Sequence, residues 1–319
     1  MPRAILTRRF PPALVEQLTA AGIDITRHNG DEPMPRAGRL EFVCGADAIV
    51  TTINDRVDDG LLDAAGDSLK LVANFGVGYD NIDLDACRAR GVLVSNTPGV
   101  LTDATADLAW TLILMAARRA VEGERMVRGG EWRGWAPTQL VGVDVTGATL
   151  GVVGAGRIGC AVARRAAGFH MTVLYAHPRN QPELDRIGAQ HVDIDQLVAE
   201  ADIISLHVPM RPETHHLISR ERIAQMKRTA ILINTARGPV VDEAALVDAL
   251  RERRIFAAGL DVYENEPRLA PGLVELHNVA LLPHLGSATE GTRTKMAEMV
   301  AANVIAALSG KPPLNPVTA

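Results

Sequence analysis

Three side chains that could do acid–base chemistry come after short apolar runs of this sequence. Arg237 follows AILINT, Glu266 follows AAGLDV, and His284 follows VALLP. An arginine can hold a carboxylate through two parallel hydrogen bonds, and a histidine can move a hydroxyl proton. A glutamate can orient the imidazole and stabilise its charged form. Lying together, they would suit oxidation of a hydroxyl beside a carboxylate, or the reverse reduction of a ketone.

Each of these residues also has a purely structural explanation. A histidine at a strand end commonly satisfies a backbone carbonyl, as His284 could. Arg237 could cap a helix, and Glu266 is one of several acids in the segment YENEP. Three strands that end at one crevice with these residue types are harder to explain by independent coincidences. The catalytic interpretation is therefore favoured.

A glycine motif supplies the partner that such chemistry needs. Gly154, Gly156 and Gly159 form the pattern G-x-G-x-x-G, directly after the apolar run TLGVV and before a helical pattern. Glycines at this spacing allow a tight turn, close approach of a pyrophosphate and close packing of helix on strand. The free amides at the helix N-terminus then face the phosphates. The motif predicts a dinucleotide cofactor, with the chemistry beside the carboxyl ends of the strands.

The elements that must position these residues alternate between short apolar strands and amphipathic helices, which indicates doubly wound parallel sheets. This alternation of strands and helices starts at the N-terminus and starts again at residue 149, so we expect two α/β domains. The tail at 287–308 has near-helical apolar spacing and no strand to cover, and we expect it to pack on the first domain. The predicted domains are 1–98 completed by a C-terminal helix in 285–319, and 99–284. The predicted strands are 4–7, 47–50, 70–74, 92–96, 149–153, 171–176, 202–208, 230–235, 257–262 and 279–283.

Composition excludes several classes of protein. The 319 residues are 47% hydrophobic and 22% charged, as in soluble globular proteins. The net charge is -5 and the basic residues are scattered, which argues against a nucleic-acid partner. The longest apolar stretch, 108–117, is too short to span a bilayer and suggests a buried helix. Three cysteines without metal-ligand spacing predict a reducing, cytoplasmic compartment and no metal site.

Five segments carry a resemblance to a known family, and they span essentially the whole chain. ANFGVGYDNID, GAGRIG, INTARG, DVYENEP and PHLGSAT occur in this order. The chain thus resembles the D-isomer-specific 2-hydroxyacid dehydrogenases, and through VGYDNID and GEWRGWAPT most resembles glyoxylate/hydroxypyruvate reductases. The resemblance implies a flavodoxin-like substrate domain and a Rossmann domain with a cleft between them. It also implies NAD(P)H-dependent reduction of a small 2-keto acid, such as glyoxylate or hydroxypyruvate, to the D-2-hydroxy acid.

The resemblance also implies roles for individual residues. Arg237, Glu266 and His284 would be catalytic. The amides around Val77 and Gly78 would bind the substrate carboxylate together with Arg237, and His284 would contact the substrate as the proton donor. The region 102–135 would form a homodimer contact, from which Trp135 would reach the neighbour's substrate site; a plain interface tryptophan is the alternative. The implied cofactor contacts are Thr105, Gly154, Gly156, Arg157, Ile158, Gly159, His177, Arg179, Pro209, Thr214, Thr235, Ala236, Asp261 and Gly286.

The residues at the end of the second strand of the Rossmann domain indicate whether NAD or NADP is the preferred cofactor. NAD-preferring domains carry an acid there, which binds the ribose 2′-hydroxyl. This strand ends VLYAHPRN, so His177 takes the acid's place and Arg179 follows. An arginine would attract a 2′-phosphate, which predicts that NADPH is preferred and NADH is still usable. The alternative is that Arg179 is a solvated loop residue and that the site is indifferent to the phosphate.

Other functions remain open at this point. Formate dehydrogenases share the architecture but place a glutamine beside the histidine, and Glu266 argues against them. A 2-hydroxyacid dehydrogenase for a larger keto acid remains an alternative. Some transcriptional corepressors use this fold as cofactor sensors and can keep all three catalytic residue types. The sequence shows no additional tail for partner binding, which makes the sensor the less favoured interpretation.

Overall fold

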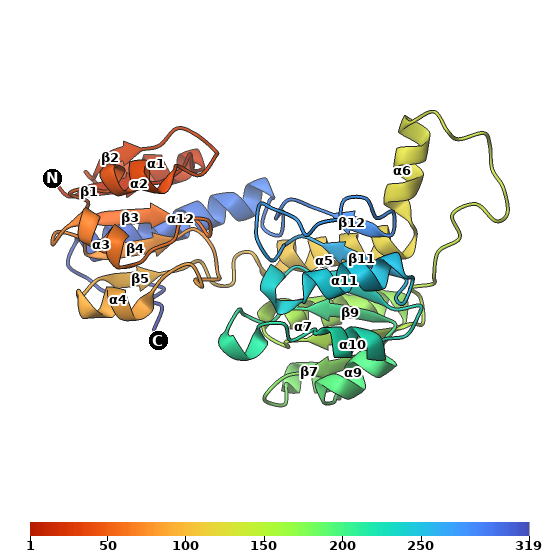
Figure 1. Cartoon of the computed structure of the whole chain (residues 1–319). Coiled ribbons are helices and arrows are strands. Elements are labelled where there is room, and N and C mark those ends of the chain that lie inside the picture. Colours follow the sequence, from red (N-terminus) through yellow and green to blue (C-terminus); the bar gives the residue numbers. More distant parts are fainter. Residues whose placement is uncertain (319) are drawn as a thin grey trace. The chain divides into compact units, whose positions relative to one another are not determined.

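The computed structural model describes residues 1–318 and divides the chain into two compact units. Unit 1 contains residues 1–101 and the segment from Ser287 onward, and unit 2 is Thr102–Gly286. Each is built on one parallel sheet with helices packed on it (Figure 1). Within the described residues, no helix combines the length and apolarity needed to cross a membrane. The fold class predicted from the sequence, two doubly wound α/β domains, is confirmed.

The sheet of unit 1 has the strand order β2-β1-β3-β4-β5 in the described chain, which is the flavodoxin-like order. Its two central strands β3 and β4 are buried along their whole length, as expected for strands covered on both faces. Edge strand β2 is polar and half-exposed, and the apolar pattern did not predict it. The strands are β1 (Arg3–Leu6), β2 (Asp24–Arg27), β3 (Ala48–Thr51), β4 (Leu71–Asn74) and β5 (Leu93–Ser95).

The helices of unit 1 come from both ends of the chain. Asp58 and Asp83 cap α3 and α4 by accepting backbone N–H groups, and Thr289 caps α12 in the same way. The buried face of α12 carries Met296 and Val300, and the helix packs on α1, β3 and β4. The helices are α1 (Pro12–Ala20), α2 (Arg36–Phe42), α3 (Asp59–Ala65), α4 (Leu84–Ala89) and α12 (Glu290–Leu308).

The sheet of unit 2 has the order β12-β11-β10-β9-β6-β7-β8 in the described chain. Its order follows the Rossmann pattern, with the switch point between β6 and β9. The short edge strand β8 is exposed and was not predicted. The strands are β6 (Thr149–Val153), β7 (Thr172–Ala176), β8 (Gln190–His191), β9 (Ile203–Leu206), β10 (Ile231–Asn234), β11 (Ala257–Leu260) and β12 (Val279–Leu281).

Helix α5 is the central helix of unit 2, and it packs on β10 and β11. A β-carbon placed on Gly259 of β11 would lie 2.9 Å from the β-carbon of Leu112, so the glycine permits this close approach. The helices are α5 (Thr102–Ala117), α6 (Ala120–Arg128), α7 (Arg157–Arg165), α8 (Pro182–Asp185), α9 (Ile194–Glu200), α10 (Arg220–Gln225) and α11 (Glu243–Arg251), and the 3₁₀ turns are η1 (Ala166–Phe169), η2 (Pro212–Thr214) and η3 (Gly238–Val240).

The segment that follows α6 leaves the body of unit 2 and returns to it before β6 (Figure 1). It carries two tryptophans that are exposed to solvent, Trp132 at 54% and Trp135 at 82%. Two large aromatic side chains on one extended segment are an unusual amount of apolar surface to leave in water.

Candidate active site

His284 and Glu266 form a hydrogen-bonded pair beyond the carboxyl ends of β12 and β11. Nδ1 of His284 lies 3.0 Å from Oε2 of Glu266, and the other carboxylate oxygen accepts the backbone N–H of Tyr263 at 3.1 Å. The two side chains keep 31% and 24% of their surface exposed, so the pair is open to a small molecule. The structure therefore brings together two of the three residues expected to be catalytic.

The charge of Glu266 decides how the imidazole can be used. Burial alone would raise the pKa of Glu266, but the hydrogen bond and charge of His284, the Tyr263 amide and the charge of Arg237 together lower it. The carboxylate is thus ionised at neutral pH and accepts a hydrogen bond from the Nδ1–H of His284. That leaves Nε2 as the atom of the ring that can exchange a proton with a substrate.

Backbone contacts fix the position of His284. The residue has a φ of 57°, in the left-handed region, and its N–H donates to the Asp261 carbonyl at 2.9 Å. The buried Asp261 carboxylate accepts the N–H groups of Leu285 at 2.6 Å and Gly286 at 2.9 Å. Thr105 donates its hydroxyl to the Gly286 carbonyl at 3.0 Å. Burial raises the pKa of Asp261, against the opposing effect of these amides and of His284.

Arg237 lies at the same edge of the sheet, beyond the end of β10. Its Nη1 donates to the Ala236 carbonyl at 2.8 Å, and its own carbonyl accepts from the side chain of Asn234 at 2.9 Å. The next residue is Gly238, where an added β-carbon would lie 1.8 Å from the Tyr263 carbonyl carbon. The arginine loop therefore packs directly against the loop that carries Glu266. Strands β10, β11 and β12 are adjacent and parallel, so all three residues share one edge.

The glycine turn after β6 has the shape of a phosphate cradle. Gly154 has a φ of 93° and Gly159 packs so closely that its β-carbon would lie 2.1 Å from the Gly154 carbonyl oxygen. Gly156 begins α7, and no described heavy atom lies within 4 Å of where its β-carbon would be. Within residues 1–318, no side chain caps this helix. The uncapped amides and the open space fit a pyrophosphate group.

The loop after β7 is ordered by a network that the sequence spacing did not reveal. The Tyr175 hydroxyl accepts the Gln181 N–H at 3.1 Å and lies 3.0 Å from Oδ1 of Asp185. His177 turns its Nδ1 toward the glycine turn and accepts the Ala155 N–H at 3.2 Å. Burial, His191 and Arg179 lower the pKa of His177, so its ring is neutral. Arg179 is exposed at the tip of this loop.

In unit 1, two asparagines hold the turn in which substrate amides were expected. Nδ2 of Asn96 donates to the Val77 carbonyl at 2.8 Å, and Nδ2 of the buried Asn74 donates to the Gly78 carbonyl at 2.6 Å. The Gly76 carbonyl accepts the backbone N–H of Thr97 at 3.1 Å. The three successive carbonyls of Gly76, Val77 and Gly78 thus all accept hydrogen bonds. Neither Asn74 nor Asn96 was predicted from the sequence, although the polar residues at the ends of KLVAN and VLVSN were a signal.

Comparison with known proteins decides the family. The model of the D-isomer specific 2-hydroxyacid dehydrogenase NAD-binding domain matches residues 110–286. The chain is 47% identical to a glyoxylate reductase of Thermococcus onnurineus, over 98% of this chain and 94% of that protein. This chain belongs to the D-isomer-specific 2-hydroxyacid dehydrogenase family. As a member it is an NAD(P)-dependent oxidoreductase whose substrate is a small keto or hydroxy acid.

Solved structures of this dehydrogenase family superpose over nearly the whole chain. A protein from Thermus thermophilus has a TM-score of 0.93 at 45% identity, covering 99% of this chain and 100% of that one. An NADPH-dependent glyoxylate/hydroxypyruvate reductase from Sinorhizobium meliloti, solved with NADP and malonate, has a TM-score of 0.86 at 34% identity. That match covers 99% of this chain and 97% of that one.

The remaining residues predicted for the dehydrogenase site are spread over several loops. Thr214 donates its hydroxyl to the Pro209 carbonyl at 2.7 Å, so these two predicted cofactor contacts share one turn. The buried hydroxyl of Thr235 has no hydrogen-bond partner among residues 1–318, which leaves it available to a ligand. Trp135 belongs to the exposed segment after α6, and the structure does not bring it together with the three predicted catalytic side chains within residues 1–318.

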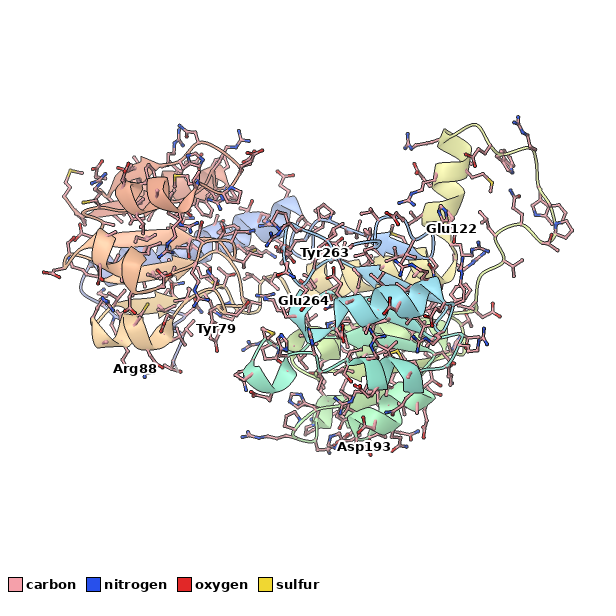
Figure 2. The ribbon with its side chains drawn as sticks, in the orientation of Figure 1. Tyr79, Arg88, Glu122, Asp193, Tyr263 and Glu264 are labelled. Atoms are coloured by element: carbon pink, nitrogen blue, oxygen red, sulfur yellow. The ribbon has the colours of Figure 1, made fainter. Side chains whose placement is uncertain are left out.

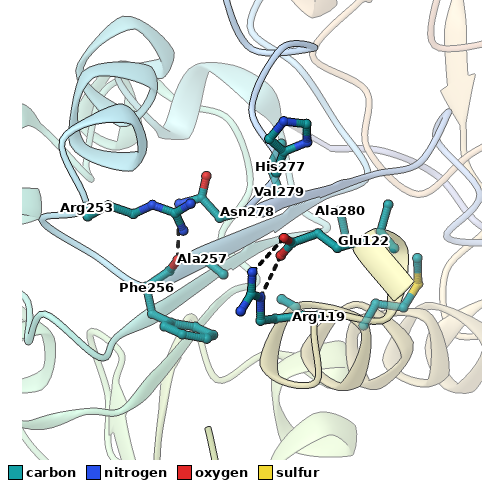
Figure 3. Close-up of a pocket in the computed structure, with 12 residues that line it drawn as sticks. Arg119, Glu122, Arg253, Phe256, Ala257, His277, Asn278, Val279 and Ala280 are labelled. Carbon is teal, nitrogen blue, oxygen red and sulfur yellow. Dashed lines mark hydrogen bonds and ion pairs between the residues drawn. The ribbon is translucent and has the colours of Figure 1, made fainter. Parts of the chain in front are cut away.

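A pocket in unit 2 of the dehydrogenase lies away from the sheet edge that carries Arg237, Glu266 and His284 (Figure 3). Its lining includes Ala257 and Val279, the first residues of β11 and β12, whereas Glu266 and His284 follow the other ends of these strands. Arg119 and Glu122 pair at 2.8 Å across its wall. The pocket therefore opens at the amino edge of the sheet and is not the catalytic site.

Proposed function

We propose that this dehydrogenase reduces glyoxylate or hydroxypyruvate to the D-2-hydroxy acid, with NADPH as the preferred cofactor. The observation that carries the proposal is the hydrogen-bonded pair of His284 and Glu266 on the same sheet edge as Arg237. The activities for which the relatives are named, glyoxylate reductase and glyoxylate/hydroxypyruvate reductase, support the choice of substrate.

The side chains divide the work of the reaction. Bound at the α7 N-terminus, the cofactor supplies the hydride. His284 donates a proton from Nε2 to the substrate oxygen, and Glu266 keeps the ring oriented and stabilises its protonated form. Arg237 binds the substrate carboxylate. In unit 1, the amides of Val77 and Gly78 are proposed to bind an anionic group of the substrate, a role that the occupied carbonyls of that turn favour.

A panel of 2-keto acids tests the substrate. Oxidation of NADPH is followed by absorbance with glyoxylate, hydroxypyruvate, pyruvate and two bulkier acids, and the configuration of the product is determined. We expect the highest kcat/KM with one of the first two and a D product where the product is chiral. A higher kcat/KM with a bulky acid would support the larger-substrate alternative. Tight cofactor binding without turnover of any acid would support a cofactor sensor.

The cofactor preference is proposed from the loop after β7. Arg179 places a positive charge at its tip, and one charge-assisted contact is worth about 1.5–3 kcal/mol, which corresponds to about tenfold or more in kcat/KM. The ratio of kcat/KM for NADPH and NADH is measured at low salt in wild type, Arg179→Ala and His177→Asp, with the remote Arg228→Ala as control. Preference for NADH in wild type, or a ratio unchanged by both loop variants, would overturn the proposal.

We further propose that the protein is a homodimer formed through 102–135, because α6 and the segment behind it expose Trp132 and Trp135. Light scattering coupled to size exclusion measures the mass. If Trp135 reaches the partner's substrate site, Trp135→Ala lowers kcat/KM for the keto acid while Trp132→Ala does not. Unit 1 is proposed to be the substrate domain and unit 2 the cofactor domain. Cytoplasmic localisation stays a prediction from cysteine usage.

A further inference from the structure

A cluster of metal-ligating side chains lies in unit 2 outside the residues used so far. His215, His216 and Glu264 each offer one ligand atom, and these atoms lie within 4.8 Å of one another. Nε2 of His216 is 2.9 Å from Oε1 of Glu264. The rings of the two histidines are stacked, with centroids 4.1 Å apart and planes at 26°. His215 is exposed and the other two are half-buried.

The backbones of both contributing loops are anchored to the same segment, η3. The N–H of His216 donates to the Pro239 carbonyl at 2.8 Å, and Gly238 packs on the peptide between Tyr263 and Glu264. The N–H of Glu264 also donates to the buried Glu243 at 2.8 Å. Figure 2 labels Glu264 and Tyr263 on this loop. The side chains therefore meet because the fold places them, rather than through flexible surface contacts.

The conformation of His216 adds a second indication. Its φ is 48°, in the left-handed region that residues other than glycine seldom adopt. This conformation accompanies the stacking of its ring on His215 and the contact with Glu264. An ion pair alone would explain His216 and Glu264. It would not involve the second imidazole, that of His215, whose ring stacks on the ring of His216.

The donor set matches a particular class of ion. Two imidazoles and one carboxylate suit Zn²⁺, and also Cu²⁺ and Ni²⁺, and three protein ligands leave a position for water. Bonds of ~2.0 Å in a tetrahedron place the ligand atoms roughly 3.3 Å apart. The ligand atoms, 2.9 Å apart in the His216–Glu264 pair and within 4.8 Å of one another overall, must therefore adjust to this spacing, which the exposure of His215 and the partial exposure of the other two permit.

We propose that His215, His216 and Glu264 bind a divalent transition-metal ion, with Zn²⁺ as the best-fitting probe. The ion would join two loops of the enzyme. One carries Thr214, a proposed cofactor contact, and the other carries Glu266. Zinc therefore restrains both loops and lowers turnover. The effect on turnover rests on the proposed function, whereas binding of the ion does not.

Binding is tested on the full-length protein after chelation and desalting. Zn²⁺ is titrated by calorimetry and Co²⁺ by its absorption spectrum. We expect one saturable site in wild type. His216→Asn, which tolerates the left-handed backbone, and Glu264→Gln should each weaken it by roughly 10- to 100-fold or more, since loss of even an outer partner costs that much. His215→Ala should weaken it as well, and each variant should keep its circular dichroism spectrum.

Two controls separate this site from other histidines. His191→Ala removes a histidine elsewhere in unit 2, and His284→Ala removes the catalytic pair; both should retain zinc binding. The proposal is overturned if no saturable site is found. It is also overturned if binding survives Glu264→Gln and His216→Asn but is lost in His284→Ala, which would assign the ion to the catalytic pair. Zinc inhibition that persists in Glu264→Gln would remove the link to turnover.

Discussion

Replacing Glu266 with glutamine removes a charge from the proposed catalytic pair and keeps its shape. The reduction takes a proton from His284, and the Glu266 carboxylate stabilises the ring that carries this proton. At 3.0 Å the charge-assisted hydrogen bond is worth about 1.5–3 kcal/mol, and about 1.4 kcal/mol corresponds to a factor of ten in rate. The side chains are 31% and 24% exposed, so solvent screening favours the lower end. kcat/KM for reduction should therefore fall about tenfold in Glu266→Gln.

The measurement is kcat/KM for reduction at saturating cofactor, recorded in metal-free buffer. Glu264→Gln is the matched control, because it makes the same change of charge two residues away on a side chain that pairs with His216. Wild type and the control should have the same kcat/KM. The pairing would have no place in the mechanism if Glu266→Gln kept the wild-type kcat/KM, or if both variants lost activity equally.

Three further changes test other parts of the structure. Arg237→Lys keeps the charge but loses the planar fork, so kcat/KM toward keto acids should fall about 10- to 100-fold while the cofactor Kd, measured by fluorescence, stays constant. Asn74→Ala removes the donor that holds the Gly78 carbonyl, and KM for the keto acid should rise roughly fivefold with kcat retained, which steady-state kinetics will show. Asp55→Asn leaves two buried arginines without their counter-ion, and urea denaturation should show a loss of about 3–5 kcal/mol in the free energy of unfolding.

The sequence predicted the buried strands of both sheets because each is an unbroken apolar run between helical patterns. Two strands had no such signal. Strand β2 reads DITR and alternates between exposed and half-buried positions, and β8 is the exposed pair Gln190–His191. Both are edge strands, defined by hydrogen bonds to one neighbour and not by burial. Helix α5 was predicted from residue 108, but it begins at Thr102, where small alanines hide its buried face from an apolar pattern.

The three catalytic candidates were predictable because each follows a strand, and parallel strands deliver their ends to one edge. Contacts between loops that are distant in the sequence could not be predicted in this way. His216 and Glu264 are 48 positions apart, and no motif in the sequence contains both. Asn74 and Asn96 act on carbonyl groups of a turn, so their role appears only when the backbone is folded. Asp185 likewise reaches the loop of Arg179 through the Tyr175 hydroxyl and the side chain of Asn180.

Unit 1 is built from two separate stretches of the chain, so it cannot finish folding during biosynthesis until the second stretch has been made. Its sheet is covered by α12, and the N–H of Val317 bonds to the Val94 carbonyl at 2.8 Å, so residues beyond 286 complete a structure begun at Arg3. Unit 2 is one uninterrupted stretch. Once Gly286 has emerged from the ribosome, every residue of unit 2 is available for folding. At that moment the face of α1 that α12 covers is still exposed. The nascent chain therefore carries an unfinished N-terminal unit until the residues of α12 have been made, and chaperones would meet that apolar face first.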